Sequence, residues 1–225
     1  GGVWYTFSGE ATNLYEVTTC NSTTNFDTEL SIYTGNCSSL SCIDGNDDDL
    51  MCSTDNMFST VRVNPLTNTQ YYVYVSGNDT AAGDFEIQVN ELDLPDNNLC
   101  QDAENIILIQ GIGTASGALG NATNLDAPSN CNADVDNTGS GGVWYTFSSS
   151  DVTQYLVTTC NNNTDFDTEI SLYTGSCGSL VCVDANDDDD NCAADASLSS
   201  IYFNSISSDD YFVYLKGNGT ANGSY

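Results

Sequence analysis

Basic residues are almost absent from this chain. Only Arg62 and Lys216 are basic, against 32 acidic residues, and there is no histidine, so the formal net charge is −30. Proteins that bind nucleic acids or anionic membrane surfaces need clustered Lys and Arg to attract phosphates. The composition therefore excludes nucleic acid and anionic lipid as partners and favours cations.

Nucleophilic catalysis also lacks its usual residues. Without histidine and with a single lysine, Ser–His, Cys–His and Ser–Lys schemes have almost no base to activate a nucleophile. Paired carboxylates can hydrolyse glycosides or peptides, but one partner then needs a raised pKa. The acidic residues here cluster in a hydrophilic loop, where a carboxyl pKa is hard to raise. We therefore predict that the chain is not an enzyme.

Long apolar runs are missing as well. No run of about 18 apolar residues occurs, so we expect no membrane span. Disordered acidic chains are poor in aromatic residues, whereas this chain has 13 Tyr and 8 Phe. The sequence therefore predicts a folded protein.

The chain repeats itself at an offset of 140 residues. The sequence GGVWYTFS at Gly1 recurs at Gly141, and the match continues without a gap to the end of the chain. Residues 91–99, ELDLPDNNL, are polar and contain a proline, as is typical of linkers. We therefore predict two modules: 1–95, which lacks its opening third, and 96–225, which lacks the closing strand seen in the first module as DFEIQVNEL.

Apolar and polar residues alternate along most segments. Phe85, Ile87 and Val89, for example, are separated by Glu, Gln and Asn. Clusters of Gly, Asn, Asp and Ser divide such runs about every ten residues, which is typical of antiparallel sandwiches. Apart from one helical turn expected at 101–105, the pattern predicts an all-β fold: tandem antiparallel β-sandwich, jelly-roll-like modules that are stapled by disulfides.

The ten cysteines contain no CxxC pair, which argues against zinc and for an oxidising compartment, extracellular or at the cell surface. Because exposed thiols oxidise outside cells, we expect all ten to form disulfides within the chain. Sequence alone leaves other pairings open. The expected pairs are Cys37–Cys42 and Cys177–Cys182 across short loops, Cys20–Cys52 and Cys160–Cys192 between a strand end and an acidic loop, and Cys100–Cys131 at the start of the second module.

Each module contains an acidic loop, CIDGNDDDLMC at 42–52 and CVDANDDDDNC at 182–192. Carboxylates crowded on so negative a chain repel one another unless a cation binds, and Ca²⁺ takes about six to eight oxygen ligands. The motif FDTE adds an aspartate in each module. The alternative is a solvated acidic turn. The predicted calcium ligands are Asp27, Asp44, Asp47 and Asp48 in the first module and Asp167, Asp184, Asp187 and Asp188 in the second.

Several asparagines match the N-x-S/T acceptor pattern for N-linked glycans. The predicted acceptors are Asn21, Asn78, Asn121, Asn162, Asn218 and Asn222. Asn78 and Asn218 rank first, because they hold the same place in the repeat, in a Gly-containing turn directly after a strand. The Ser- and Thr-rich composition leaves O-glycans open.

Four motifs together, GVWYTF, TTC…FDTELSIYTG, NDD and YYVYVSG, resemble the bacterial pre-peptidase C-terminal domain in its cysteine-bearing, tandem form. The resemblance covers 97–225 and again 1–96. It implies a jelly-roll-like β-sandwich in a secreted protein, often an accessory or surface module beside a hydrolase, although no hydrolase is present here. Complement-type CUB modules are the alternative family. The calcium ligands that the resemblance implies are Asp27, Asp47 and Asp48, and Asp167, Asp187 and Asp188.

We predict a structural repeat of an extracellular filament or cell-surface protein, with other copies of itself as head-to-tail partners. A sandwich that lacks a strand leaves unpaired N–H and C=O groups, which a neighbouring copy can complete, for example with the apolar segment NIILIQ at 105–110. The alternative is a carbohydrate-binding accessory module of a secreted hydrolase or adhesin. Its sugar-stacking residues would be Trp4, Trp144, Tyr72 and Tyr74.

Overall fold

The chain forms two compact units, Gly1–Asp93 (unit 1) and Leu94–Tyr225 (unit 2), so the boundary lies two residues before the one expected from the sequence. Both are built from β-strands, and the predicted all-β class is confirmed. Among the described residues, no helix is long and apolar enough to cross a membrane. This computed structural model describes residues 1–9, 13–50, 52, 54–64, 69–149, 153–205 and 209–225.

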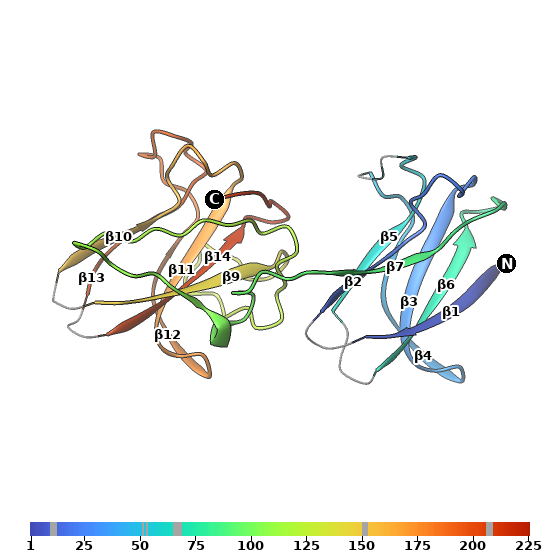
Figure 1. Cartoon of the computed structure of the whole chain (residues 1–225), viewed down its shortest axis with the longest axis horizontal. Coiled ribbons are helices and arrows are strands. Elements are labelled where there is room, and N and C mark those ends of the chain that lie inside the picture. The colour runs from blue at the N-terminus through green and yellow to red at the C-terminus, as the bar shows by residue number, and fades with distance from the viewer. Residues whose placement is uncertain (10–12, 51, 53, 65–68, 150–152, 206–208) are drawn as a thin grey trace. The chain divides into compact units, whose positions relative to one another are not determined.

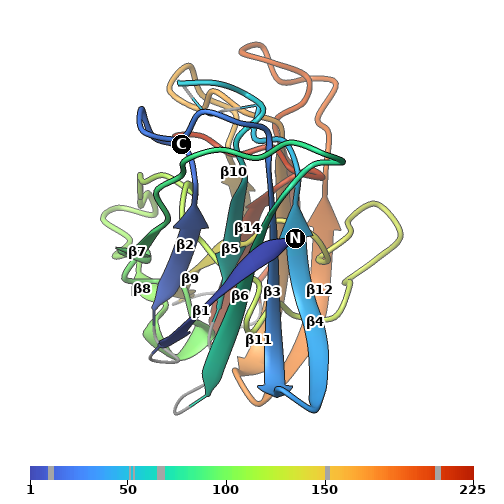
Figure 2. The same ribbon diagram turned by 90° about the vertical axis from the view of Figure 1, so that its right-hand side faces the viewer.

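Unit 1 consists of two antiparallel sheets (Figures 1 and 2). One sheet has the strand order β1-β6-β3-β4 and the other has the order β5-β2-β7. The strands are β1 (Gly2–Ser8), β2 (Leu14–Thr18), β3 (Thr28–Asn36), β4 (Ser39–Asn46), β5 (Thr60–Val63), β6 (Gln70–Gly77) and β7 (Gln88–Leu92).

The core of unit 1 lies between these two sheets. Along β6, Tyr71, Val73 and Val75 are buried and alternate with less buried neighbours, as expected for a strand with one face toward a core. They belong to one apolar cluster with Val17 of β2 and Val61 of β5, from the other sheet. The period-two pattern of the sequence therefore produces a two-layer sandwich.

Unit 2 repeats this arrangement and adds to it. Its sheets have the orders β12-β11-β14-β9-β8 and β10-β13, and each strand from β9 to β14 corresponds to one from β1 to β6. β8 has no counterpart in unit 1 and runs parallel to β9, in contrast to the purely antiparallel pairing expected. The elements are η1 (Cys100–Asp102), β8 (Glu104–Asn105), β9 (Gly142–Ser148), β10 (Gln154–Thr158), β11 (Thr168–Ser176), β12 (Ser179–Asn186), β13 (Ser200–Asn204) and β14 (Asp210–Gly217).

Residues 94–141, which we call the strap, wind along unit 2 as the green segment in Figure 1. The strap contains the 3₁₀ turn η1, where one helical turn is expected, and the strand β8. Ile106 and Leu108 of the strap pack against the core of unit 2. Within this chain the segment 105–110 therefore packs on its own unit.

Two disulfides tie a strand end to the acidic loop. They are Cys20–Cys52 and Cys160–Cys192, each with a sequence separation of 32, and they are the pairs that the repeat predicts. Both halves of each pair lie within one unit and in the same place in the two copies. A cross-link of this kind stabilises by restricting the unfolded chain, by about 3–4 kcal/mol in the chain-entropy model.

The other two disulfides fasten the strap. They are Cys100–Cys177 and Cys131–Cys182, with Cα–Cα distances of 5.6 and 5.2 Å. The expected pairs Cys100–Cys131 and Cys177–Cys182 are therefore wrong. In the β11–β12 hairpin, Cys182 lies opposite Tyr173 rather than Cys177, and the strap brings its own cysteines to both positions.

Cys37 and Cys42 occupy the corresponding places in unit 1. Both are exposed and neither forms a disulfide, so the expectations of a Cys37–Cys42 bond and of ten bonded cysteines are wrong. Cys42 lies opposite Tyr33 in the β3–β4 register, which separates it from Cys37 in the same way. No described residue of unit 1 takes the place of the strap.

Candidate metal centre

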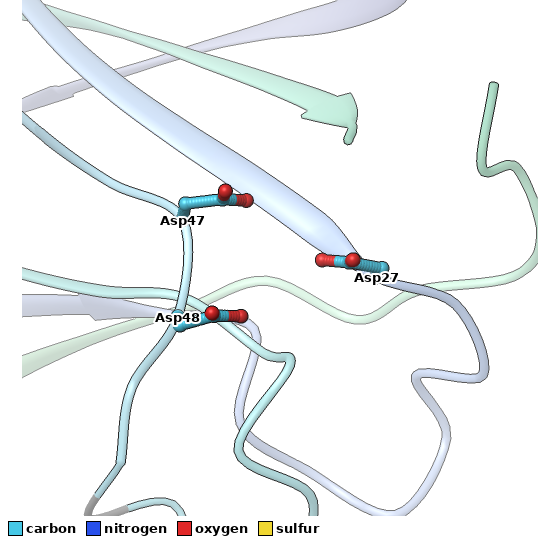
Figure 3. Close-up of side chains that lie close together, drawn as sticks. All are labelled: Asp27, Asp47 and Asp48. Atoms are coloured by element: carbon cyan, nitrogen blue, oxygen red, sulfur yellow. The ribbon is translucent and has the colours of Figure 1, made fainter. Parts of the chain in front are cut away.

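Three carboxyl groups of unit 1 come together at one end of the β3–β4 hairpin. Asp27 directly precedes β3, and Asp47 and Asp48 directly follow β4. Because antiparallel neighbours place the start of one strand beside the end of the other, the three side chains meet. One oxygen of each carboxylate lies within 4.8 Å of the others, and the groups point toward a common space (Figure 3).

Hydrogen bonds to the backbone hold this acidic loop in place. The Asn46 amide nitrogen donates to the Asp48 carbonyl oxygen (3.0 Å), and the Ser59 hydroxyl donates to the Asp47 carbonyl oxygen (2.8 Å). The Thr60 N–H donates to the Asn46 side-chain oxygen (2.9 Å). None of these three contacts uses a carboxylate oxygen, so they order the loop and leave the carboxylates available.

Asn78, at the end of β6, faces the same carboxylates. Its backbone N–H donates to the Asp27 carbonyl oxygen (3.1 Å), and its side-chain nitrogen donates to Asp47 Oδ2 (3.1 Å). Asp27 Oδ1 is buried and has no hydrogen-bond partner among the described residues. A buried carboxylate oxygen without a donor is costly, because it has lost water and gained nothing in exchange. A cation at this place would remove that cost.

Unit 2 builds the same cluster from Asp167, Asp187 and Asp188. The Asn186 amide nitrogen donates to the Asp188 carbonyl oxygen (2.9 Å), and the Ser199 hydroxyl donates to the Asp187 carbonyl oxygen (2.7 Å). Oδ1 of both Asp167 and Asp187 is buried without a hydrogen-bond partner among the described residues. The cluster is therefore a feature of both copies and has the same supports.

Burial first, and then repulsion between the carboxylates, raises the pKa of an aspartate in each cluster. Burial, and then the charges of Asp188, Glu169 and Asp167, raise the pKa of Asp187 from 3.8 to about 6. In unit 1 burial, and then the charge of Asp27, raise the pKa of Asp47. The expectation that a carboxyl pKa is hard to raise in this loop is therefore wrong, because the loop partly buries these groups. Raised carboxyl pKa values are also expected for residues that bind a cation.

Asp44 and Asp184, two of the predicted ligands, lie outside these clusters. They are exposed on β4 and β12, and their carboxylates accept from the next N–H, that of Gly45 (2.8 Å) or Ala185 (2.9 Å). The strand continues to Asn46 or Asn186 before the ligand loop begins, so these aspartates belong to the ladder. Asp44 and Asp184 are therefore not part of the candidate site.

Asn78 and Asn218, which the sequence predicts as glycan acceptors, contact the carboxylates of the two clusters. Their side-chain nitrogens, which would carry a glycan, donate to Asp47 and Asp187 at 3.1 Å. A glycan would be attached to the same nitrogen that makes this contact, so the contact counts against these two acceptors. The sequence does indicate a shared role for these two asparagines, because both directly follow the strand that pairs with β3 or β11.

The comparisons with known proteins agree with the fold. Residues 2–77 match the family model for the bacterial pre-peptidase C-terminal domain, which confirms the predicted resemblance over this range. The matched range spans β1 to β6 and includes the acidic residues of unit 1. No curated protein matches the chain. Unit 2 repeats the matched strands at an offset of 140 residues. Residues 2–77 are therefore similar to the bacterial pre-peptidase C-terminal domain.

Proposed function

We propose that the chain is part of a calcium-stabilised structural repeat of an extracellular filament or cell-surface protein. The matched family consists of non-catalytic accessory domains that are typical of secreted bacterial proteins, and the disulfides agree with an oxidising compartment. The observation that carries the proposal is the recurrence of the acidic cluster, with its buried unpartnered oxygens, in both units.

Calcium is the cation that the donor set favours. The cluster offers only oxygens, and the sequence has no histidine, so soft and imidazole-preferring metals lack their ligands. In unit 1, Asp27, Asp47 and Asp48 would hold the ion. Asn78 can add its side-chain oxygen, because an amide can turn to present either atom. In unit 2, Asp167, Asp187, Asp188 and Asn218 would take the same roles.

Chelation is the direct test of the calcium site. An ion that binds only the folded unit stabilises it by about 2.7 kcal/mol at a hundredfold excess over Kd. We therefore expect denaturant unfolding of the full chain to move to lower denaturant in EDTA and to recover with added Ca²⁺. Calorimetric titration should find two sites per chain, one in each unit.

Variants assign each site to its unit. Asp27→Asn should remove the response of unit 1 alone and Asp187→Asn that of unit 2 alone, as resolved by hydrogen exchange. Asp44→Asn is the matched control, since it removes an exposed carboxylate outside the cluster. Unchanged unfolding on chelation, or an equal loss in the control, would contradict the calcium site.

Other copies of the same protein are the proposed partners. Repeated modules on a common offset, each stapled by the same disulfide, suit a head-to-tail extracellular filament. Electron microscopy and sedimentation of the native material test this. Fibres or long oligomers are expected, and a compact monomer would rule out the filament.

Glycosylation is proposed at exposed acceptors. Asn162 and Asn222 are exposed, whereas the side-chain nitrogen of Asn21 already donates to the Glu86 carbonyl oxygen (2.8 Å). A bulky sugar needs a free side chain that points into solvent. Mass mapping of native peptides should find Asn162 and Asn222 modified before Asn78 and Asn218, and the reverse order would contradict the assignment.

The carbohydrate-binding alternative now depends on unit 1. Trp144 is fully buried, so it cannot stack on a sugar. Trp4 is 49% exposed and lies 4.7 Å from the Tyr74 ring, centroid to centroid, so it remains the aromatic candidate. Loss of polysaccharide retention in Trp4→Ala would support this function, and unchanged retention would exclude it.

A further inference from the structure

The same heptapeptide, GVWYTFS, forms β1 in unit 1 and β9 in unit 2, in two different environments. Trp4 is 49% exposed, whereas its counterpart Trp144 is 0% exposed. Val3 and Tyr5 are also exposed, although the corresponding residues of β9 are buried. The sequence and the pairing of these strands with β6 and β14 are the same, so the difference lies in what covers them.

The strap covers β9. The indole N–H of Trp144 donates to Asp126 Oδ1 (3.1 Å), and the Tyr173 hydroxyl donates to the Ser129 carbonyl oxygen (3.0 Å), both in the strap. Trp144, Tyr173 and Tyr214 form a second apolar core on this outer face, together with Cys100 of the strap.

Unit 1 contains the aromatic residues that correspond to this second core, but not the strap that covers them. The ring of Trp4 lies 4.7 Å from that of Tyr74 and 5.6 Å from that of Tyr33, close to the 4.8 and 6.2 Å of the corresponding pairs in unit 2. We call the surface formed by Trp4, Tyr33 and Tyr74 the bare face. It is assembled without a cover, and its aromatic rings need no rearrangement to accept one.

Two free thiols flank the bare face. Cys37 and Cys42 are exposed and unbonded, and they correspond to Cys177 and Cys182, each of which bonds to a cysteine of the strap. Unit 1 therefore has both of the cysteines whose counterparts in unit 2 bond to the strap.

The glycine that precedes β1 also differs in its surroundings from its counterpart before β9. A side chain at Gly141 would clash with the backbone of Ala122 in the strap, so glycine is required there. Gly1 occupies the same place in the repeat and has nothing within 4 Å of an added Cβ. The space beside Gly1 is therefore open at the place that Ala122 occupies beside Gly141 in unit 2.

We propose that the bare face of unit 1 is the docking surface for a second strap, a segment built like residues 94–141 that another repeat of this protein supplies. Its two cysteines bond to Cys37 and Cys42 as Cys100 and Cys131 bond in unit 2. Each bond joins two thiols, which lose two protons and two electrons to a small-molecule disulfide that is reduced to two thiols. The proposal shares with the proposed function the need for further repeats, and it is independent of calcium and of filament formation.

A synthetic peptide of residues 94–141 tests the surface directly. We would incubate it with the full chain in a buffer of reduced and oxidised glutathione and map the products without reduction. The expected product is a one-to-one adduct in which peptide Cys100 joins Cys37 and peptide Cys131 joins Cys42. Once one bond forms, the second becomes intramolecular, so the doubly linked product should exceed singly linked ones by on the order of 10²-fold.

Controls separate docking from random thiol coupling. A peptide of scrambled sequence with its cysteines at the same positions should yield on the order of 10²-fold less doubly linked adduct. Trp4→Ala, which keeps both thiols, should lower the yield as well. Tryptophan emission should shift to shorter wavelength on docking of the peptide, and this shift should be absent in Trp4→Phe.

Three results would overturn the proposal: equal yields with the scrambled peptide, bonds to cysteines other than Cys37 and Cys42, or a Cys37–Cys42 bond that forms in preference to the adduct. Failure to form filaments would leave all three readouts unaffected, so the two proposals fail separately.

Discussion

Units 1 and 2 contain the same strands and the same acidic cluster, but they differ in how much of the shared sheet is buried. In unit 2, β9 is packed on both faces, with Val143 and Tyr145 in the main core and Trp144 in the core under the strap. In unit 1, β1 lies at an edge of its sheet with Val3, Trp4 and Tyr5 exposed. Burial of this strand is therefore decided by a segment outside the repeated strands of the module.

The electrostatics of the two units differ at the same surface. In unit 2, Lys216 Nζ lies 3.2 Å from Glu169 Oε1, and both side chains are almost completely buried. The strap also contacts this ion pair, because the Asp136 N–H donates to Glu169 Oε2 (2.9 Å). Unit 1 has Ser76 in place of Lys216, and its Glu29 remains exposed. The buried Glu169 is therefore paired with a lysine, whereas the exposed Glu29 is solvated.

The largest contrast should come from the two tryptophans. Trp144→Ala removes a fully buried ring and should destabilise unit 2 by roughly 3–5 kcal/mol. Trp4→Ala removes a half-exposed ring and should cost unit 1 about 1 kcal/mol or less. Hydrogen exchange followed by mass spectrometry reports the two units separately. Equal losses would mean that the strap contributes little to the burial of β9.

The buried ion pair should give the next largest effect. Lys216→Ser makes unit 2 resemble unit 1 and leaves Glu169 charged and buried, at a cost of about 3 kcal/mol. The double change Lys216→Ser with Glu169→Gln should recover most of this loss in denaturant unfolding. Ser76→Lys in unit 1 is the matched control and should change stability by no more than about 0.5 kcal/mol, because the site is open to water.

The pH dependence of the acidic clusters should provide the smallest effect. The pKa of Asp187 in the folded state, about 6, lies above its ordinary value of 3.8, so the folded state binds the proton more tightly. Its stabilising contribution is therefore complete below about pH 4 and is lost as the pH rises through about 6. In EDTA, the stability of the wild type relative to Asp187→Asn should fall over this window.

Calcium should reverse this trend, because the ion needs the ionised carboxylate and its affinity should rise as Asp187 deprotonates. Titrations at several pH values between 4 and 7 measure this. In unit 1 the pKa of Asp47 is raised by the same causes, so the affinity there should change in the same direction. A calcium affinity independent of pH in both units would contradict the involvement of these aspartates.

Much of the candidate site follows from local sequence. The acidic residues lie within a few positions of strand ends, and adjacent antiparallel strands bring Asp27 to Asp47 and Asp48 without any distant segment. Asp44 could not be separated from the ligands in this way, since the end of β4 is set by its pairing with β3 rather than by the acidic pattern. Asn78 was missed as a cluster residue because β6 approaches the loop only through the sheet.

The amino-acid sequence by itself determined the strands, the two-module repeat and the pairs Cys20–Cys52 and Cys160–Cys192. Alternation of apolar and polar residues is a local property, and it imposes the same strand in both copies. Only the tertiary structure decided the partners of Cys177 and Cys182 and the burial of Trp144. These depend on where the strap passes, and one heptapeptide is compatible with a covered and an open face, because burial is a property of the surroundings rather than of the strand.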